Sequence, residues 1–98
     1  MNNTEAFNYY KNLLAFLIFK IRTTEFNNSY YTARNIESYD IEYIEVCEYS
    51  ILGKHTVITY TFSSRHTEDM LKNTYKNLLE SINHNLLEQK LDDIYSIL

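Results

Sequence analysis

Apolar residues in the last third of the chain, residues 67–98, recur in steps of three and four, which places them on one stripe of an α-helix. Ser64 or Thr67 is expected to cap this helix, and the two acidic residues after Thr67 place negative charge at the positive end of its dipole. The pattern weakens at residues 83–85, so the segment is either one long helix or two helices with a bend near His84. The stripe consists of Leu71, Tyr75, Leu78, Ile82 and Leu86.

A second helical pattern occupies residues 3–22, and Asn3 or Thr4 is expected to cap its start. Within it, residues 13–19 are apolar on every side of the helix. A membrane span needs ~20 apolar residues, so this shorter run predicts a helix that is covered on more than one side. Because a small domain covers one side alone, we expect a second copy of the chain to contribute. The seam toward the core consists of Phe7, Tyr10, Leu14, Leu17 and Ile21.

The segment that follows is less regular. Residues 23–29 are polar and predict a loop. Residues 30–37 are compatible with a strand or with a short helix, and the β-prone Tyr30, Tyr31 and Ile36 favour the strand.

Residues 39–62 predict a β-hairpin. The only glycine of the chain lies in Gly53-Lys54, and a two-residue type II′ turn at this place would pair Tyr49 with Ile58. The register divides the hairpin into two faces, and the first of them has the composition of a core. That face carries Tyr39, Ile41, Tyr43, Cys47, Tyr49, Ile51, Ile58, Tyr60 and Phe62.

Glu45 is the one charged residue on this expected core face, so we expect a β-bulge near it. The opposite face combines polar and charged residues with Ile44, Val46 and Val57. It is more apolar than a solvated face requires. We therefore expect this second face to be covered as well.

These elements together predict an α+β fold with an N-terminal helix, an antiparallel sheet of two or three strands and a long C-terminal helix. A chain of 98 residues has the length of one small domain, so residues 1–98 are expected to form a single unit.

Composition and charge narrow the classes of function. The net charge of −4 argues against binding to nucleic acid or to anionic membranes, because both favour a basic patch. The single Cys47 excludes an internal disulfide, and it is expected as a buried structural thiol. The N-terminus lacks the features of a signal peptide, so a cytoplasmic protein without a membrane span is expected. The abundance of Asn, Ile and Tyr suggests an AT-rich genome such as that of a virus, phage or plasmid.

The best candidate for binding a small molecule is the stretch Ser64, Arg65 and His66, which joins the last strand to the long helix. Free N–H groups at a helix start favour an anion, and Arg65 adds a positive charge. The plainer interpretation is that Ser64 or Thr67 caps the helix while Arg65 is solvated. The three histidines are widely spaced and no Cys-x-x-Cys pattern or phosphate loop is present, so no metal and no cofactor are predicted.

An acidic set of residues lies along the hairpin. It could present a negative surface to a basic partner, as proteins that imitate DNA do, or it could simply keep a strand soluble. The set comprises Glu37, Asp40, Glu42, Glu45 and Glu48.

The leading hypothesis is a small non-catalytic protein-interaction module that forms a homodimer, with an accessory or host-directed inhibitory role if the source is a virus, phage or plasmid. It rests on missing catalytic motifs together with an excess of apolar surface. The residues expected at its interface are Leu13, Phe16, Phe19, Ile44, Val46, Val57, Leu87 and Leu91.

Two alternatives stay open. A dimeric winged-helix-like DNA-binding protein would use residues 48–61 as its wing, with Lys54 and His55 at the tip, although residues 23–38 are short for a recognition helix. An enzyme or binder of a phosphorylated small molecule would use Arg65 and His66 at a dimer interface.

Overall fold

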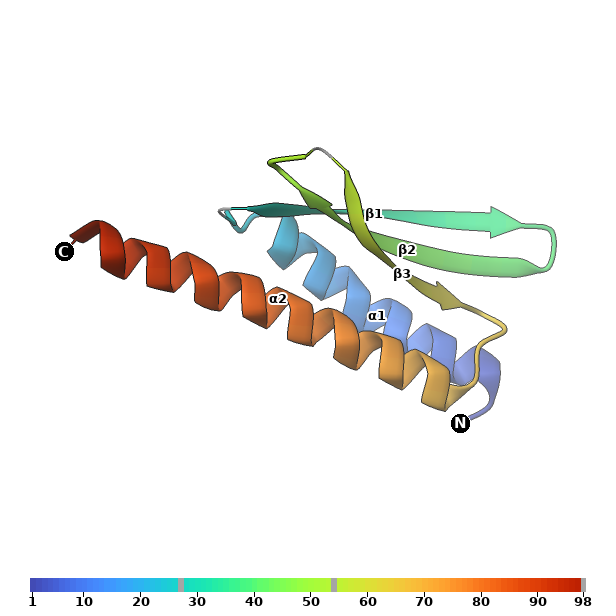
Figure 1. Ribbon diagram of the computed structural model, residues 1–98. Helices are drawn as coiled ribbons and strands as arrows, with labels where there is room; N and C mark the ends of the chain where they lie inside the picture. Colours follow the sequence, from blue (N-terminus) through green and yellow to red (C-terminus); the bar gives the residue numbers. More distant parts are fainter. Residues whose placement is uncertain (27, 54, 98) are drawn as a thin grey trace.

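The computed structural model describes residues 1–26, 28–53 and 55–97, and within residues 88–97 it describes the helix backbone alone. Within these ranges the chain forms two helices and three strands, in the order α1 (Asn3–Arg22), β1 (Ser29–Ser38), β2 (Ile41–Ser50), β3 (Thr56–Ser63) and α2 (Glu68–Ile97). The strands form an antiparallel sheet in the order β1-β2-β3, and α1 and α2 lie side by side on one side of it (Figure 1). The predicted α+β fold is confirmed, and residues 30–37 belong to a strand.

Helix α1 is capped one residue earlier than expected. The side chain of Asn2 caps it, since its Oδ1 accepts a hydrogen bond of 2.8 Å from the Glu5 N–H. The prediction that Asn3 or Thr4 caps the helix is therefore wrong. The predicted end at Arg22 is confirmed, and there the Thr23 hydroxyl donates to the carbonyl oxygen of Lys20 at 3.1 Å.

Helix α2 is unbroken from Glu68 to Ile97, so the alternative of two separate helices is wrong. Thr67 caps its start, because its Oγ1 accepts from the Met70 N–H at 3.3 Å. Asparagine often breaks helices because its side chain competes for backbone hydrogen bonds. The Asn85 amide instead donates to Tyr31 and Glu48 on the sheet. The helix therefore continues through the segment where its apolar pattern weakens.

The two helices start at the same end of the molecule and run in the same direction (Figure 1). The N-terminal amine of Met1 lies 3.4 Å from a carboxylate oxygen of Glu68, and the rings of Tyr10 and Tyr75 are 5.6 Å apart. Because α1 has 20 residues and α2 has 30, the last turns of α2 extend beyond the end of α1. At 1.5 Å per residue this extension measures about 15 Å.

The register between β2 and β3 differs from the expected one by one residue. Ile58 lies opposite Glu48 rather than Tyr49, and Tyr60 lies opposite Val46. The connection is also longer than a two-residue turn, because β2 ends at Ser50 and β3 begins at Thr56. Within this connection Gly53 lacks the positive φ that a type II′ turn needs, and Lys54 lies outside the described residues.

The β-bulge also lies elsewhere than predicted. The register shifts between Glu48 and Tyr49, close to the connection, and not near Glu45. Because successive side chains of a strand point to opposite faces, a slip of one residue exchanges the two faces of β2. The buried residues of this strand are therefore Ile44, Val46 and Glu48.

The assignment of the core face was thus wrong for β2 and right for the second half of β3. Tyr60 and Phe62 are buried as expected, whereas Cys47 is partly exposed on the opposite face, where its sulfur lies 3.5 Å from the Thr59 hydroxyl. On the second face, the β2 residues Ile44 and Val46 are covered by the helices of the same chain, as predicted, whereas Val57 on β3 is 53% exposed. Helices α1 and α2 contribute the two stripes that the periodicity predicted, all of whose members are buried or partly buried.

Candidate functional site

Among the described side chains, the most exposed apolar surface on a helix is the side of α1 that faces away from the sheet. We call this the outward face of α1 and define it by Tyr9, Asn12, Phe16 and Phe19. Phe16 is 80% exposed, Phe19 is 72% exposed and Tyr9 is 49% exposed. The opposite side of the same helix is buried against the sheet and α2 through Phe7, Leu14 and Ile21. Helix α1 is therefore apolar on two sides, and the chain covers one of them.

A shallow groove of about 380 Å³ lies beside the outward face, where α1 meets α2. Tyr9 and Leu13 form its wall on α1, and Tyr75 and Leu79 form its wall on α2. Burial raises the pKa of the Tyr75 phenol above its ordinary value, so this ring stays neutral at physiological pH. The groove extends the apolar surface of the outward face across to the second helix.

The residues that the sequence predicts for an interface lie in several places. Leu13 is half-buried beside the exposed Phe16 and Phe19 on α1. Ile44 and Val46, however, are buried on the inner face of the sheet, so they cannot belong to an external surface.

Three further predicted interface residues lie away from α1. Val57 is 53% exposed on β3 and Leu87 is 57% exposed on α2. The side chain of Leu91 lies outside the described residues. The structure thus brings Leu13, Phe16 and Phe19 together on one helix and separates the others from them.

The predicted anion site has polar groups that are already engaged. Ser64 binds the backbone of Glu42 twice, donating its N–H to the carbonyl oxygen at 2.8 Å and accepting at its Oγ from the Glu42 N–H at 3.1 Å. Nδ1 of His66 accepts from the Ser63 N–H at 3.2 Å. The bonds of Ser64 fasten the connection between β3 and α2 to the start of the central strand β2.

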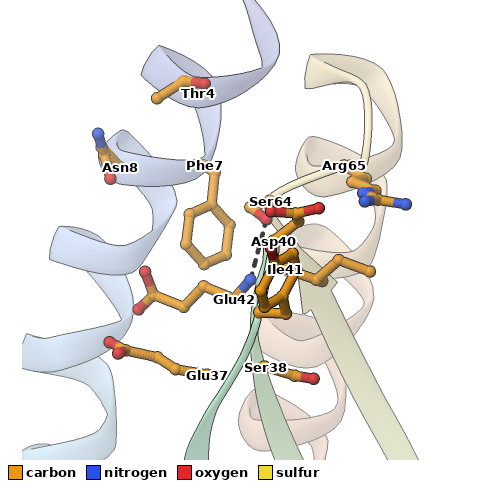
Figure 2. Close-up of a pocket in the computed structure, with 11 residues that line it drawn as sticks. Thr4, Phe7, Asn8, Glu37, Ser38, Asp40, Ile41, Glu42, Ser64 and Arg65 are labelled. Atoms are coloured by element: carbon orange, nitrogen blue, oxygen red, sulfur yellow. Dashed lines mark hydrogen bonds between the residues drawn. The ribbon is translucent and has the colours of Figure 1, made fainter.

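Ser64 and Arg65 line a cleft of about 610 Å³ between the start of α1 and the turn that joins β1 to β2 (Figure 2). The Arg65 side chain extends away from Ser64 and from Asp40 in this view (Figure 2). Glu37, Asp40 and Glu42 supply three carboxylates to the same lining. The surroundings therefore disfavour an anion, and the predicted anion site stays a prediction.

Two members of the acidic set, Glu42 and Glu45, are neutralised by basic neighbours within the chain. Glu42 binds Lys11 and accepts from the Asn35 amide at 3.0 Å, and these two hydrogen bonds lower the pKa of its carboxyl group. Glu45 pairs with Arg34 at 2.8 Å on the outer face of the sheet. These two pairs interrupt the continuous negative surface that an imitation of DNA needs.

Glu48 is a buried carboxylate that was not among the site residues predicted from the sequence. This residue is only 7% exposed, and its Oε1 accepts hydrogen bonds from Tyr31 at 2.6 Å, from Ser81 at 2.6 Å and from Asn85 at 3.1 Å. Burial, and then the bond to Glu48, raise the pKa of the Tyr31 phenol, which therefore remains a donor. The signal that could have found Glu48 is its even spacing from Ile44 and Val46 along the strand.

The Glu48 cluster joins β1, β2 and α2 at one point. Four polar side chains satisfy one another there, as buried polar groups must. We regard the cluster as a structural connection, since its donors and its acceptor are engaged with each other.

The described residues also give no support to a metal site, a membrane span or a winged-helix fold. Among the described side chains, no three His, Cys, Asp or Glu residues gather closely enough to hold a metal ion. Neither described helix is both long enough and apolar enough to cross a membrane. Between α1 and β2 the described chain forms strand β1, where a winged-helix protein would need its recognition helix.

Comparison with protein-family models, with curated proteins and with solved structures found no significant match. The expected origin in a virus, phage or plasmid stays a prediction.

Proposed function

We propose that this chain is a non-catalytic protein-interaction module that self-associates as a homodimer through the outward face of α1. The observation that supports this is the exposure of Phe16 and Phe19, at 80% and 72%, on a helix whose other side already forms the core. A solvated helix face normally carries polar residues. Two exposed phenylalanines one turn apart are typical of a surface that is covered in the functional state.

Burial of the Phe16 and Phe19 rings contributes enough free energy for reversible association. A buried aromatic ring removes 150–250 Å² from water, so these two rings expose on the order of 300 Å² in each copy. At ~25 cal/mol per Å² this area corresponds to roughly 7 kcal/mol per copy before the costs of association. Those costs are estimated at about 4–15 kcal/mol. Because these costs offset much of the gain, we expect weak and reversible self-association.

The alternatives receive less support from the same contacts. An enzyme that used Arg65 and His66 would need both side chains to converge, whereas His66 accepts from the backbone and the Arg65 side chain extends away from Ser64 (Figure 2). The carboxylates of that cleft repel a phosphorylated ligand. Self-association requires no rearrangement of the described residues.

The test is sedimentation velocity of the full chain over a range from low to high micromolar concentration. The wild type is expected to shift from monomer toward dimer, and Phe16→Glu is expected to weaken association by about thirtyfold or more, as the loss of an interface anchor does. Tyr39→Glu is the matched control, because Tyr39 is a fully exposed aromatic residue at the β1–β2 turn, away from this face. A wild type that stays monomeric throughout would refute the proposal.

A further inference from the structure

We propose that the second copy packs its α1 antiparallel against this α1, with Phe16 of each copy facing Asn12 of the other. This inference rests on the proposed self-association and specifies the geometry and charge of the partner surface. It concerns the orientation of the two helices, which the exposure of the outward face alone leaves open.

The spacing of the outward face is that of a helix–helix seam. Tyr9, Asn12, Phe16 and Phe19 follow one another in steps of three, four and three residues, as the a and d positions of a heptad do. Packed antiparallel about a two-fold axis, this seam places Tyr9 opposite Phe19 of the second copy. Each copy then presents the same patch, so the contact closes as a dimer.

The charges at the two ends of α1 decide whether the two copies of this helix pack parallel or antiparallel. Glu5 lies in the first turn, and Lys20 and Arg22 lie in the last turn. Arg22 donates to the carbonyl oxygen of Ala33 at 3.0 Å. Glu5 and Lys20 are exposed, and their side chains form no hydrogen bond or ion pair with another described residue.

An antiparallel pair brings each Glu5 to within about one helical turn of Lys20 of the second copy, at both ends of the seam. A parallel pair would instead place the two Glu5 carboxylates against each other, at a position that belongs to the seam itself. Opposite helix dipoles also favour the antiparallel pair, since each positive N-terminus lies beside a negative C-terminus. A parallel pair would gain one contact between the two Asn12 amides, which does not offset the repulsion of two carboxylates.

The surface area that the dimer would bury supports a reversible dimer rather than an obligate one. Together the three rings of the outward face expose roughly 400 Å² in each copy, taking about 200 Å² for a whole ring. Two copies therefore bury on the order of 800 Å² of ring surface before the flanking side chains are added. Stable specific interfaces begin near 1,200 Å², so the ring surface alone falls below that class, in the range of weak and transient contacts.

The orientation can be measured with spin labels on the full chain. Cys47 is first replaced by Ser, which keeps a hydroxyl near Thr59, and a single cysteine is then introduced by Asn8→Cys or by Ala15→Cys. Both positions are exposed and lie on the same flank of α1, one heptad apart. In the antiparallel pair the two labels at position 15 are offset along the helix by about 3 Å, whereas those at position 8 are offset by about 18 Å. In a parallel pair both positions give the same distance between labels.

A cycle of charge-reversal variants gives an independent measurement of the helix orientation. Glu5→Lys and Lys20→Glu are each expected to weaken dimerisation about three- to tenfold, because each replaces two attractions by two repulsions. The double variant restores both attractions and is expected to dimerise as the wild type does. Asp40→Lys is the control for net charge, since Asp40 lies at the β1–β2 turn on the sheet side of the molecule.

The outcomes separate the two proposals. A larger separation at position 8 than at position 15, together with restoration in the double variant, supports the antiparallel pair. Equal separations in a protein that does dimerise would overturn the antiparallel orientation and leave self-association intact. Labels that show no pair distance at any concentration would overturn both.

Discussion

Glu45 and Glu48 lie three residues apart on β2 and have opposite surroundings. Glu45 is on the outer face of the sheet, paired with Arg34, whereas Glu48 is buried among Tyr31, Ser81 and Asn85. The sequence predicted the reverse, with Glu45 as the charged residue on the core face. Nothing in the local residue types distinguishes the two, because both glutamates are flanked by apolar or aromatic neighbours. Only the pairing of the strands decides which one is buried.

Replacing each of these glutamates by Ala is expected to give unequal losses of stability. Glu48→Ala leaves the buried Tyr31 and the partly buried Ser81 and Asn85 without their acceptor, so we expect the free energy of unfolding to fall by about 2–4 kcal/mol. Glu45→Ala removes a surface pair and should cost less than about 1 kcal/mol. Denaturant unfolding of both variants measures the difference. A larger loss for Glu45→Ala would favour the register expected from the sequence over that of the structure.

At the scale of elements, the helices could be predicted from the sequence and the hairpin register could not. The stripe through Leu71, Leu78 and Ile82 is separated from polar positions, so the helical period is unambiguous. Strand β2 instead carries large apolar or aromatic residues on both faces, which makes either phase plausible. The glycine at position 53 suggested a short turn, but the chain uses a longer connection with a bulge, and this shifts the pairing by one residue.

Two leucines of α2 provide a matched pair for testing the phase of that helix. Leu78 is fully buried between the helices and the sheet, whereas Leu87 is 57% exposed. Leu78→Ala should therefore lower the free energy of unfolding by about 2–5 kcal/mol, because it leaves a cavity in the core. Leu87→Ala should cost less than about 1 kcal/mol in the monomer. Denaturant melts at a dilute protein concentration measure both, and similar losses would mean that the helix is rotated relative to the structure.

At the scale of the whole molecule, both helices lie on one side of the sheet. Helix α1 has apolar residues on two of its own sides. The sequence did predict that residues 13–19 exceed what one sheet can cover, and Phe16 and Phe19 are exposed accordingly. It did not predict which other residues would join them. Ile44 and Val46 were expected outside because the strand phase was inverted, and α1 and α2 cover them within the chain. Long-range packing of this kind is absent from any local pattern.

The claim that α1 uses opposite faces for the core and for a second copy is tested most directly by backbone amide NMR spectra along a dilution series. Resonances of Tyr9, Asn12, Phe16 and Phe19 are expected to shift with concentration as the dimer forms. Those of the buried Leu14 and of Tyr30, on the outer face of the sheet, are expected to shift little. Spectra that do not change with concentration would contradict self-association. Changes centred on the outer face of the sheet would show that the chain associates through a different surface.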